Sequence, residues 1–152
     1  MHEKTQDFAK EIEKNRALIG LDIGEKSIGV AISDTTHIIA SPDSVYTRRN
    51  ISKDLGYLNE YIQKLNIGGI VIGLPLDLSG QEGENCEKVR AFATKLHKKT
   101  SLPVLLKDER MSTASATRAL KESGMTRKKR ELLDDKVAAS YILQGVLDLL
   151  KS

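Results

Sequence analysis

The first feature of the chain is a pattern of apolar positions that predicts three strands close together. Residues 18–23 form an almost unbroken apolar run, which is typical of a strand buried on both faces. Residues 28–33 alternate larger apolar side chains with glycine and alanine, and they predict a second strand. Because only a tight turn separates these strands, we expect them to pair antiparallel. A third short strand is predicted at 37–40, ended by Ser41-Pro42.

Beyond residue 50 the apolar positions recur every three or four residues, which is the spacing of a helix. The first such helix carries Ile51, Leu55, Leu58, Ile62 and Leu65. Asn50 is placed to cap this helix, and Gly68-Gly69 to end it. A short, fully apolar strand follows at 70–74, and its composition suits the interior of a sheet.

The second half of the chain continues the alternation of helix and strand. The loop 75–84 leads into a helix with an apolar face made of Cys86, Val89, Ala93 and Leu96. An apolar strand is predicted at 104–106, a helix at 112–123 and a last helix at 134–150. Three strands followed by helix–strand–helix–strand–helix–helix indicate an α/β fold. Its later strands should be parallel and joined by right-handed crossovers.

The N-terminal segment lies outside this pattern. Residues 1–16 are polar, and we expect them to form a loosely attached extension. Phe8 and Ile12 stand one helical turn apart, so a short helix is compatible with the segment. Residues 17–152 are then a single domain, which agrees with the usual size of domains.

Composition and charge narrow the compartment and the class of function. The chain has one cysteine, Cys86, without metal-ligand spacing around it, so we expect a reducing, cytoplasmic environment. No apolar run is long enough to span a membrane, and the N-terminus lacks the apolar core of a signal peptide. The chain has no Trp and only two Phe, which disfavours a large aromatic platform for stacking bases. A net charge of +3 is too small to indicate nucleic-acid binding by itself.

Acidic residues occur at three places where the pattern predicts burial or a strand end. Asp22 lies inside the first apolar run, where an unpaired carboxylate is costly, so it needs a cation, a metal ion or water at the strand end. Asp108 and Glu109 follow the strand 104–106, and sites in α/β sheets gather outside the carboxyl ends of strands.

The third acidic position is Asp135, on the last predicted helix. Asp135 shares one helix face with Ala138, Ala139, Ile142, Val146 and Leu149. This face is the apolar one, so Asp135 should point toward the sheet. Asp134 lies partly off that face and is the poorer candidate.

Carboxylates that converge on one point repel each other unless cations lie between them. Oxygen ligands of this kind select Mg²⁺ or Mn²⁺, and such a cluster can support phosphodiester hydrolysis. The candidate catalytic and metal-binding residues are therefore Asp22, Asp108, Glu109 and Asp135. Simpler interpretations stay open. Asp135 can be a first-turn acid favoured by the helix dipole, and the Asp108-Glu109 pair can be loop acids beside Arg110.

Positive charges are concentrated shortly before Asp135. A phosphate clamp for nucleic acid would consist of Arg127, Lys128, Lys129 and Arg130, extended by Arg110 and Arg118. The alternative is a solvated loop. The segment GLDIGEKS is not a phosphate-binding loop, because Glu25 stands where that motif requires glycine directly before lysine.

Four stretches together resemble the YqgF family, whose members are described as Holliday junction resolvases and as pre-16S rRNA nucleases. The stretches are GLDIGEKSIGVAISD (20–34), VIGLPLDLSGQEG (71–83), KDERMSTASA (107–116) and RKKRELLDDKVAASYILQ (127–144). The resemblance implies a ribonuclease H-like fold, with a three-strand antiparallel meander, two parallel strands and flanking helices. The resemblance spans about 17–150.

The resemblance also implies a metal-dependent acidic site at Asp22, at the pair Asp108-Glu109 and at Asp135. Neighbouring strand residues face opposite ways, so one of the paired acids should be a ligand. The chain departs from the family at Asp77, where asparagine is common, at Ser79, where an acid is common, and at Ser27, where many members have arginine.

These features lead to a main hypothesis and three alternatives. The main hypothesis is a cytoplasmic, Mg²⁺- or Mn²⁺-dependent endonuclease that processes the 5′ end of pre-16S rRNA. A resolvase of four-way DNA junctions would need two paired cuts, so a homodimer would suit it better than a monomer. A non-catalytic RNA-binding or ribosome assembly factor would not need the acidic residues. An ATP-binding module would need two such domains, and 152 residues hold one.

Overall fold

The computed structural model describes residues 1–75, 83–108 and 127–151, with side chains in the last range described from Asp135 onward. The sheet consists of β1 (Leu18–Ile23), β2 (Ser27–Ser33), β3 (Ala40–Thr47), β4 (Gly69–Leu74) and β5 (Val104–Asp108). Its order is β3-β2-β1-β4-β5, with β1, β2 and β3 antiparallel and β1, β4 and β5 parallel. The predicted five-stranded mixed sheet is confirmed.

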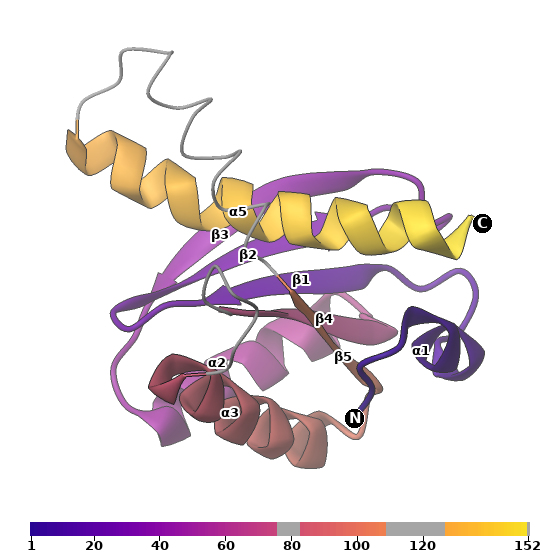
Figure 1. Cartoon of the computed structure of the whole chain (residues 1–152), viewed down its shortest axis with the longest axis horizontal. Coiled ribbons are helices and arrows are strands. Elements are labelled where there is room, and N and C mark those ends of the chain that lie inside the picture. Colours follow the sequence, from indigo (N-terminus) through magenta and orange to yellow (C-terminus); the bar gives the residue numbers. More distant parts are fainter. Residues whose placement is uncertain (76–82, 109–126, 152) are drawn as a thin grey trace.

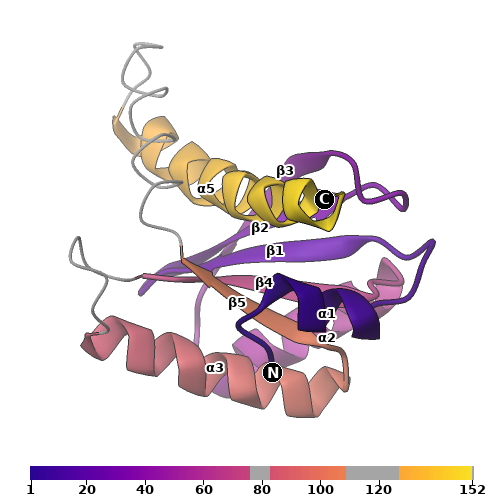
Figure 2. The ribbon, with the colours of Figure 1, turned by 45° about the vertical axis from the view of Figure 1, so that its right-hand side comes forward.

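The helices cover both faces of this sheet. They are α1 (Thr5–Glu11), α2 (Ile51–Lys64), α3 (Glu84–Thr100) and α5 (Arg127–Leu150). Helix α5 lies on one face, and α2 and α3 lie on the other (Figures 1 and 2). Alternate strand residues supply the two cores. Ile19 and Leu21 belong to the core beneath α2 and α3, whereas Leu18 belongs to the core beneath α5.

Small residues let α5 approach the sheet closely. A Cβ atom at Gly29 of β2 would lie 1.9 Å from the carbonyl oxygen of Asp135, and one at Gly20 of β1 would lie 2.8 Å from the Cβ of Leu143. Ala138 and Ala139 are both buried in this contact. The predicted inward face of the helix is therefore confirmed at Ala138, Ala139, Ile142 and Val146, whereas Leu149 at its end is 45% exposed.

The third strand does not lie where the sequence analysis placed it. Residues 37–40 mostly belong to a turn, in which the Asp34 carboxylate accepts hydrogen bonds from the backbone N–H groups of Ile38 at 2.7 Å and Ile39 at 2.9 Å. The strand starts at Ala40 and includes Pro42. Proline is tolerated there because β3 is an edge strand and the register shifts between Val30 and Ala31.

The last helix is longer than predicted. Helix α5 begins at Arg127, seven residues before the predicted start at Asp134. The predicted helix at 112–123 lies outside the described residues. Asn50 caps α2 as expected, because its side chain accepts a hydrogen bond from the Lys53 backbone N–H at 2.9 Å.

The N-terminal segment packs against the rest of the domain, so the prediction of a loosely attached extension is wrong. Phe8 of α1 is fully buried in the core beneath α5. His2 forms a parallel bridge with β5, since its N–H donates to the Val104 carbonyl at 2.8 Å and its carbonyl accepts from the Leu106 N–H at 2.9 Å. One aromatic side chain and backbone pairing anchor a segment whose composition is otherwise polar.

Two expectations from composition bear on the described part of the chain. Cys86 is a buried residue of α3. Within the ranges that the structure covers, no helix is both long enough and apolar enough to cross a membrane.

Candidate active site

Asp22 and Asp135 meet on the same side and at the same end of the sheet. Asp22 pairs with Gly29 in the β1–β2 ladder, and the backbone of Asp135 lies directly against Gly29. By strand alternation Asp22 shares its face with Leu18, which packs beneath α5. Asp22 and Asp135 are both partly buried. Two of the predicted acidic residues, far apart in the chain, are therefore brought together.

Ser27 orients the carboxylate of Asp135. The Ser27 hydroxyl, at the start of β2, donates a hydrogen bond to Oδ2 of Asp135. Ser27 lies two positions before Gly29, so the two residues share the face that meets α5. The sequence analysis singled out Ser27 as a departure from the family, and no local pattern pointed to its contact with Asp135.

Asp108 lies on the other face of the sheet. It shares strand alternation with Val104 and Leu106, whose side chains belong to the core beneath α2 and α3. It is exposed and pairs in register with Leu74 at the end of β4. The structure therefore does not group Asp108 with Asp22 and Asp135. Glu109 lies outside the described residues.

The predicted phosphate clamp is only partly described. Residues 127–130 form the first turn of α5, so the basic run is helical and not a loop. The side chains of residues 127–130 and all atoms of Arg110 and Arg118 lie outside the part of the chain that the structure describes. The start of α5 lies at the same end of the molecule as the β1–β2 turn (Figure 1).

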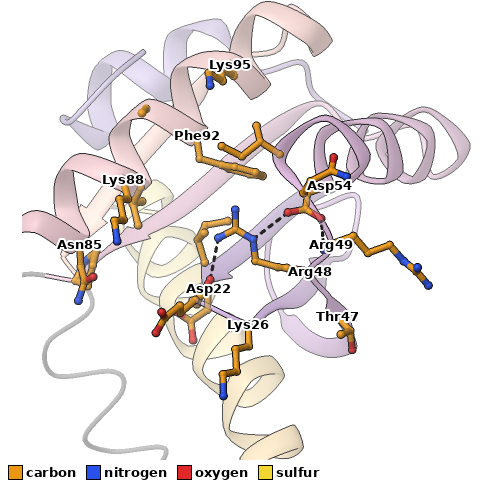
Figure 3. Close-up of a pocket in the computed structure, with 18 residues that line it drawn as sticks. Asp22, Lys26, Thr47, Arg48, Arg49, Asp54, Asn85, Lys88, Phe92 and Lys95 are labelled. Atoms are coloured by element: carbon orange, nitrogen blue, oxygen red, sulfur yellow. Dashed lines mark hydrogen bonds and ion pairs between the residues drawn. The ribbon is translucent and has the colours of Figure 1, made fainter.

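A cavity of about 1010 Å³ opens beside Asp22, on the α2 and α3 side of the sheet. Besides Asp22, its lining includes five basic side chains: Lys26, Arg48, Arg49, Lys88 and Lys95. We name this cavity the basic groove. Figure 3 shows Arg48 in its middle, Lys88 and Lys95 along α3, and Lys26 and Arg49 extending from its rim. The sequence analysis missed these residues, although the pair Arg48-Arg49 stands directly before the helix cap Asn50.

Arg48 joins three elements around the groove. Its Nε donates to Oδ2 of Asp54 in α2 at 3.0 Å, and its Nη1 donates to the carbonyl of Gly24 in the β1–β2 turn at 2.9 Å. Its guanidinium lies 5.2 Å from the ring centroid of Phe92 in α3. Arg48 thus fixes the turn that begins two residues after Asp22.

Asp54 is the buried partner of Arg48. It is 1% exposed, and its Oδ1 accepts hydrogen bonds from the Tyr46 hydroxyl and the Arg49 backbone N–H, both at 2.9 Å. Burial alone raises the pKa of Asp54, but the hydrogen bonds from Arg49, Arg48 and Tyr46 outweigh it and lower that pKa below its ordinary value. Asp54 therefore stays ionised and balances the charge of Arg48.

The described residues supply part of the donor set for a metal ion. Asp22 and Asp135 provide carboxylate oxygens, which are the donors that Mg²⁺ and Mn²⁺ prefer. Within the ranges that the structure covers, no group of three or more His, Cys, Asp or Glu side chains lies close enough to hold a metal ion. The chemistry of the two donors fits a hard divalent ion, and a complete protein site needs a further ligand.

The chain is similar to known proteins over nearly its whole length. The family model described as "RuvX: Holliday junction resolvase" matches residues 16–149. A protein of Ehrlichia chaffeensis is 46% identical over 151 residues, which are 99% of this chain and 97% of that protein. A protein of Wolbachia sp. subsp. Brugia malayi is 49% identical over 142 residues, which are 93% of this chain and 92% of that protein. Both carry the name "Putative pre-16S rRNA nuclease".

Two solved structures share the fold at low sequence identity. T. thermophilus RuvC in complex with a Holliday junction substrate matches with a TM-score of 0.53 and 14% identity, over 83% of this chain and 91% of that chain. Fowlpox virus resolvase with its substrate Holliday junction DNA matches with a TM-score of 0.55 and 14% identity, over 90% of this chain and 99% of that chain. These matches confirm the predicted ribonuclease H-like fold.

Proposed function

The chain belongs to the RuvX family, also called YqgF, and from this membership we propose that it is a nuclease that hydrolyses phosphodiester bonds in structured nucleic acid. The two relatives described above are named for pre-16S rRNA, so we propose this precursor, cut at its 5′ end, as the substrate. The proposal includes a cytoplasmic location, in keeping with a chain that contains one cysteine.

One observation carries the proposal: Asp22 and Asp135 lie together at the end of the sheet, and Asp22 also lines a groove with basic side chains. Acidic oxygens next to cations that can hold phosphates are the combination that metal-assisted phosphodiester hydrolysis requires.

We assign the roles in the site as follows. Asp22 and Asp135 would hold a divalent cation, Mg²⁺ or Mn²⁺, with Glu109 as the further ligand. Glu109 is preferred to Asp108 because Asp108 lies on the face opposite Asp22. When bound, the cation would supply Lewis-acid stabilisation and lower the pKa of a bound water. Ser27 holds the Asp135 carboxylate in place through its hydrogen bond.

We also propose phosphate contacts from the predicted phosphate clamp. The candidates are Arg110, Arg118, Arg127, Lys128, Lys129 and Arg130. The four consecutive residues support this role because they form the first turn of α5, two turns before Asp135. Cations there would neutralise the substrate backbone close to the acidic centre.

The decisive experiment is a cleavage assay with two substrates. Purified protein is incubated with a pre-16S rRNA fragment and with a synthetic four-way DNA junction, each with Mg²⁺ or Mn²⁺. Asp135→Asn tests the site, and Asp148→Asn on the same helix is the matched control, because Asp148 is exposed. We expect the wild type and Asp148→Asn to cut the RNA and Asp135→Asn to leave it intact. If the wild type binds the RNA without cutting it, the nuclease proposal fails in favour of a non-catalytic RNA-binding factor.

A second candidate substrate is the four-way DNA junction. The description of the family model and the two structural neighbours with bound junctions favour it. Junction resolution needs two coordinated cuts, so this function requires two active sites in one assembly. Preferential cutting of the junction by a protein with the mass of a dimer in light scattering would support this candidate over the RNA nuclease.

A further inference from the structure

We propose that the basic groove is a nucleic-acid-binding surface that holds the sugar–phosphate backbone of the substrate on the α2 and α3 side of Asp22. This inference rests on the proposed function and adds where the substrate runs. Residues 127–130 of the predicted phosphate clamp lie at the start of α5, on the other face of the sheet. The groove therefore adds a second surface, on the opposite side of the acidic centre.

The groove is continuous with the acidic site. Asp22 itself lines it, followed by Ile23 and Gly24 of the β1–β2 turn. A strand of nucleic acid that lies in the groove would thus pass Asp22 at the end of β1. The binding surface and the candidate active site share a residue, so contacts in the groove can determine which phosphodiester reaches Asp22.

The charge of the groove suits a polyanion. Arg48 is balanced by the buried carboxylate of Asp54, at 3.0 Å. The other basic side chains are Lys26, Arg49, Lys88 and Lys95, all exposed, against the acidic Asp22 and Glu25. These four cations come from the β1–β2 turn, the β3–α2 connection and α3, so the fold gathers them from three separate segments.

The arrangement of the cations favours an extended ligand over a single phosphate. Lys88 and Lys95 are seven residues apart on α3, which corresponds to about 10.5 Å along the helix axis. Lys26 and Arg49 extend from the rim (Figure 3). Charges spread along one wall and a rim can meet successive phosphates of a nucleic-acid backbone, and they need not converge on one point.

The groove is suited to phosphates more than to bases. Phe92 is the aromatic residue in its lining, but that ring is 3% exposed and the Arg48 guanidinium lies over it at 5.2 Å. A base therefore has little ring surface to stack on. Binding through the groove should be largely independent of sequence and strongly dependent on salt.

The experiment measures binding separately from cleavage. A fluorescein-labelled pre-16S rRNA fragment is titrated with protein in EDTA, and fluorescence anisotropy gives Kd over a series of salt concentrations. The test variant is Lys88→Ala/Lys95→Ala. The matched control is Lys98→Ala/Lys99→Ala, which removes two exposed lysines from the same helix outside the groove. Circular dichroism checks that both variants are folded.

We expect the groove variant to bind about tenfold or more weakly near 100 mM salt, with the slope of log K against log salt reduced by about 1.4 to 1.8 for two lost phosphate contacts. The control should keep the wild-type slope. An unchanged slope in Lys88→Ala/Lys95→Ala overturns the groove proposal, and so does an equal loss in both variants or a wild type that does not bind the RNA.

Cleavage by the wild type, measured separately with Mg²⁺ or Mn²⁺, tests the proposed function. A protein that binds through the groove but cuts no substrate would end the nuclease proposal and leave the groove in place. If the wild type cuts RNA and the groove variant binds it as tightly as the wild type does, the nuclease proposal stands and the groove proposal is wrong. The two failures are therefore distinguishable.

Discussion

The Ser27 hydroxyl of β2 donates a hydrogen bond to the Asp135 carboxylate of α5, 108 residues further along the chain. This bond ties the hairpin that follows Asp22 to the helix that carries the second acidic residue of the site. A carboxylate has two oxygens with several lone pairs, so Asp135 can accept this hydrogen bond and still offer an oxygen to a metal ion. Ser27 is therefore a positioning residue.

Replacing Ser27 with alanine should reduce cleavage without unfolding the protein. We expect kcat to fall about tenfold, which corresponds to about 1.4 kcal/mol, because Asp135 loses the group that orients it. KM for RNA should stay unchanged, and Ser27→Thr should restore most of the rate because it keeps the hydroxyl. Equal activities for Ser27→Ala and Ser27→Thr would contradict the positioning role.

Asp22→Asn should abolish cleavage while the fold remains. The change removes one negative charge and keeps the size of the side chain, so we expect cleavage to fall by at least about a hundredfold, the scale of losing one group that stabilises developing charge. Thermal unfolding should show a protein about as stable as the wild type. A variant that cuts at the wild-type rate would remove Asp22 from the mechanism.

The sheet, and the position of Asp22 and Asp135 at one end of it, could be predicted from the sequence because both depend on local patterns. The run around Asp22 and the tight turn after it predict a hairpin, and helical spacing alone turns Asp135 inward. The third strand was predicted too early in the chain, because Pro42 was interpreted as the end of the strand and lies inside it. An edge strand needs fewer backbone donors than a central one, so the proline is accommodated.

The basic groove and the anchoring of the N-terminus could not be predicted in this way. The groove cations Lys26, Arg49 and Lys88 come from three segments that only the folded sheet brings together. Phe8 stands in a polar segment, and its burial depends on Leu18, Val71 and other residues of a core that forms from distant elements. Neither feature has a periodic signal in the sequence.

The anchoring of α1 predicts a large loss of stability in Phe8→Ala. Phe8 is fully buried, and truncating a buried phenylalanine costs about 3 to 5 kcal/mol through lost burial and the cavity left behind. Urea unfolding measures this difference. Lys10→Ala, an exposed change in the same helix, should stay within about 0.5 kcal/mol of the wild type. A similarly small effect for Phe8→Ala would mean that the segment is loosely attached after all.

The predicted phosphate clamp and the basic groove should contribute independently to RNA binding. Residues 127–130 and the groove lysines lie on opposite sides of the sheet. The variant that combines alanine at 127–130 with Lys88→Ala/Lys95→Ala should therefore lose as much binding free energy as the two separate variants lose together. Each set should also flatten the salt dependence on its own. Anisotropy titrations of the three variants test this, and a salt slope unchanged by the substitutions at 127–130 would remove the clamp from the binding surface.

The buried pair of Arg48 and Asp54 should make stability depend on pH in acid. The folded protein lowers the pKa of Asp54 below its ordinary value of 3.8, through hydrogen bonds that outweigh the effect of burial. A carboxyl group with a lowered pKa stabilises the fold above the unfolded-state pKa, and this contribution is lost as the pH falls through the folded-state value. At pH 7, Asp54→Asn leaves Arg48 without its charge partner and should cost about 3 kcal/mol.

This cost should be constant between pH 7 and about pH 5 and should shrink below about pH 4, where Asp54 in the unfolded wild type becomes protonated. Urea unfolding of the wild type and Asp54→Asn at pH 7, 5 and 3.5 measures the difference. Asp148→Asn, at an exposed position of α5, should show a small difference at all three values. If the cost of Asp54→Asn stayed the same down to pH 3.5, the ionised carboxylate would not be what holds Arg48 and the turn after Asp22 in place.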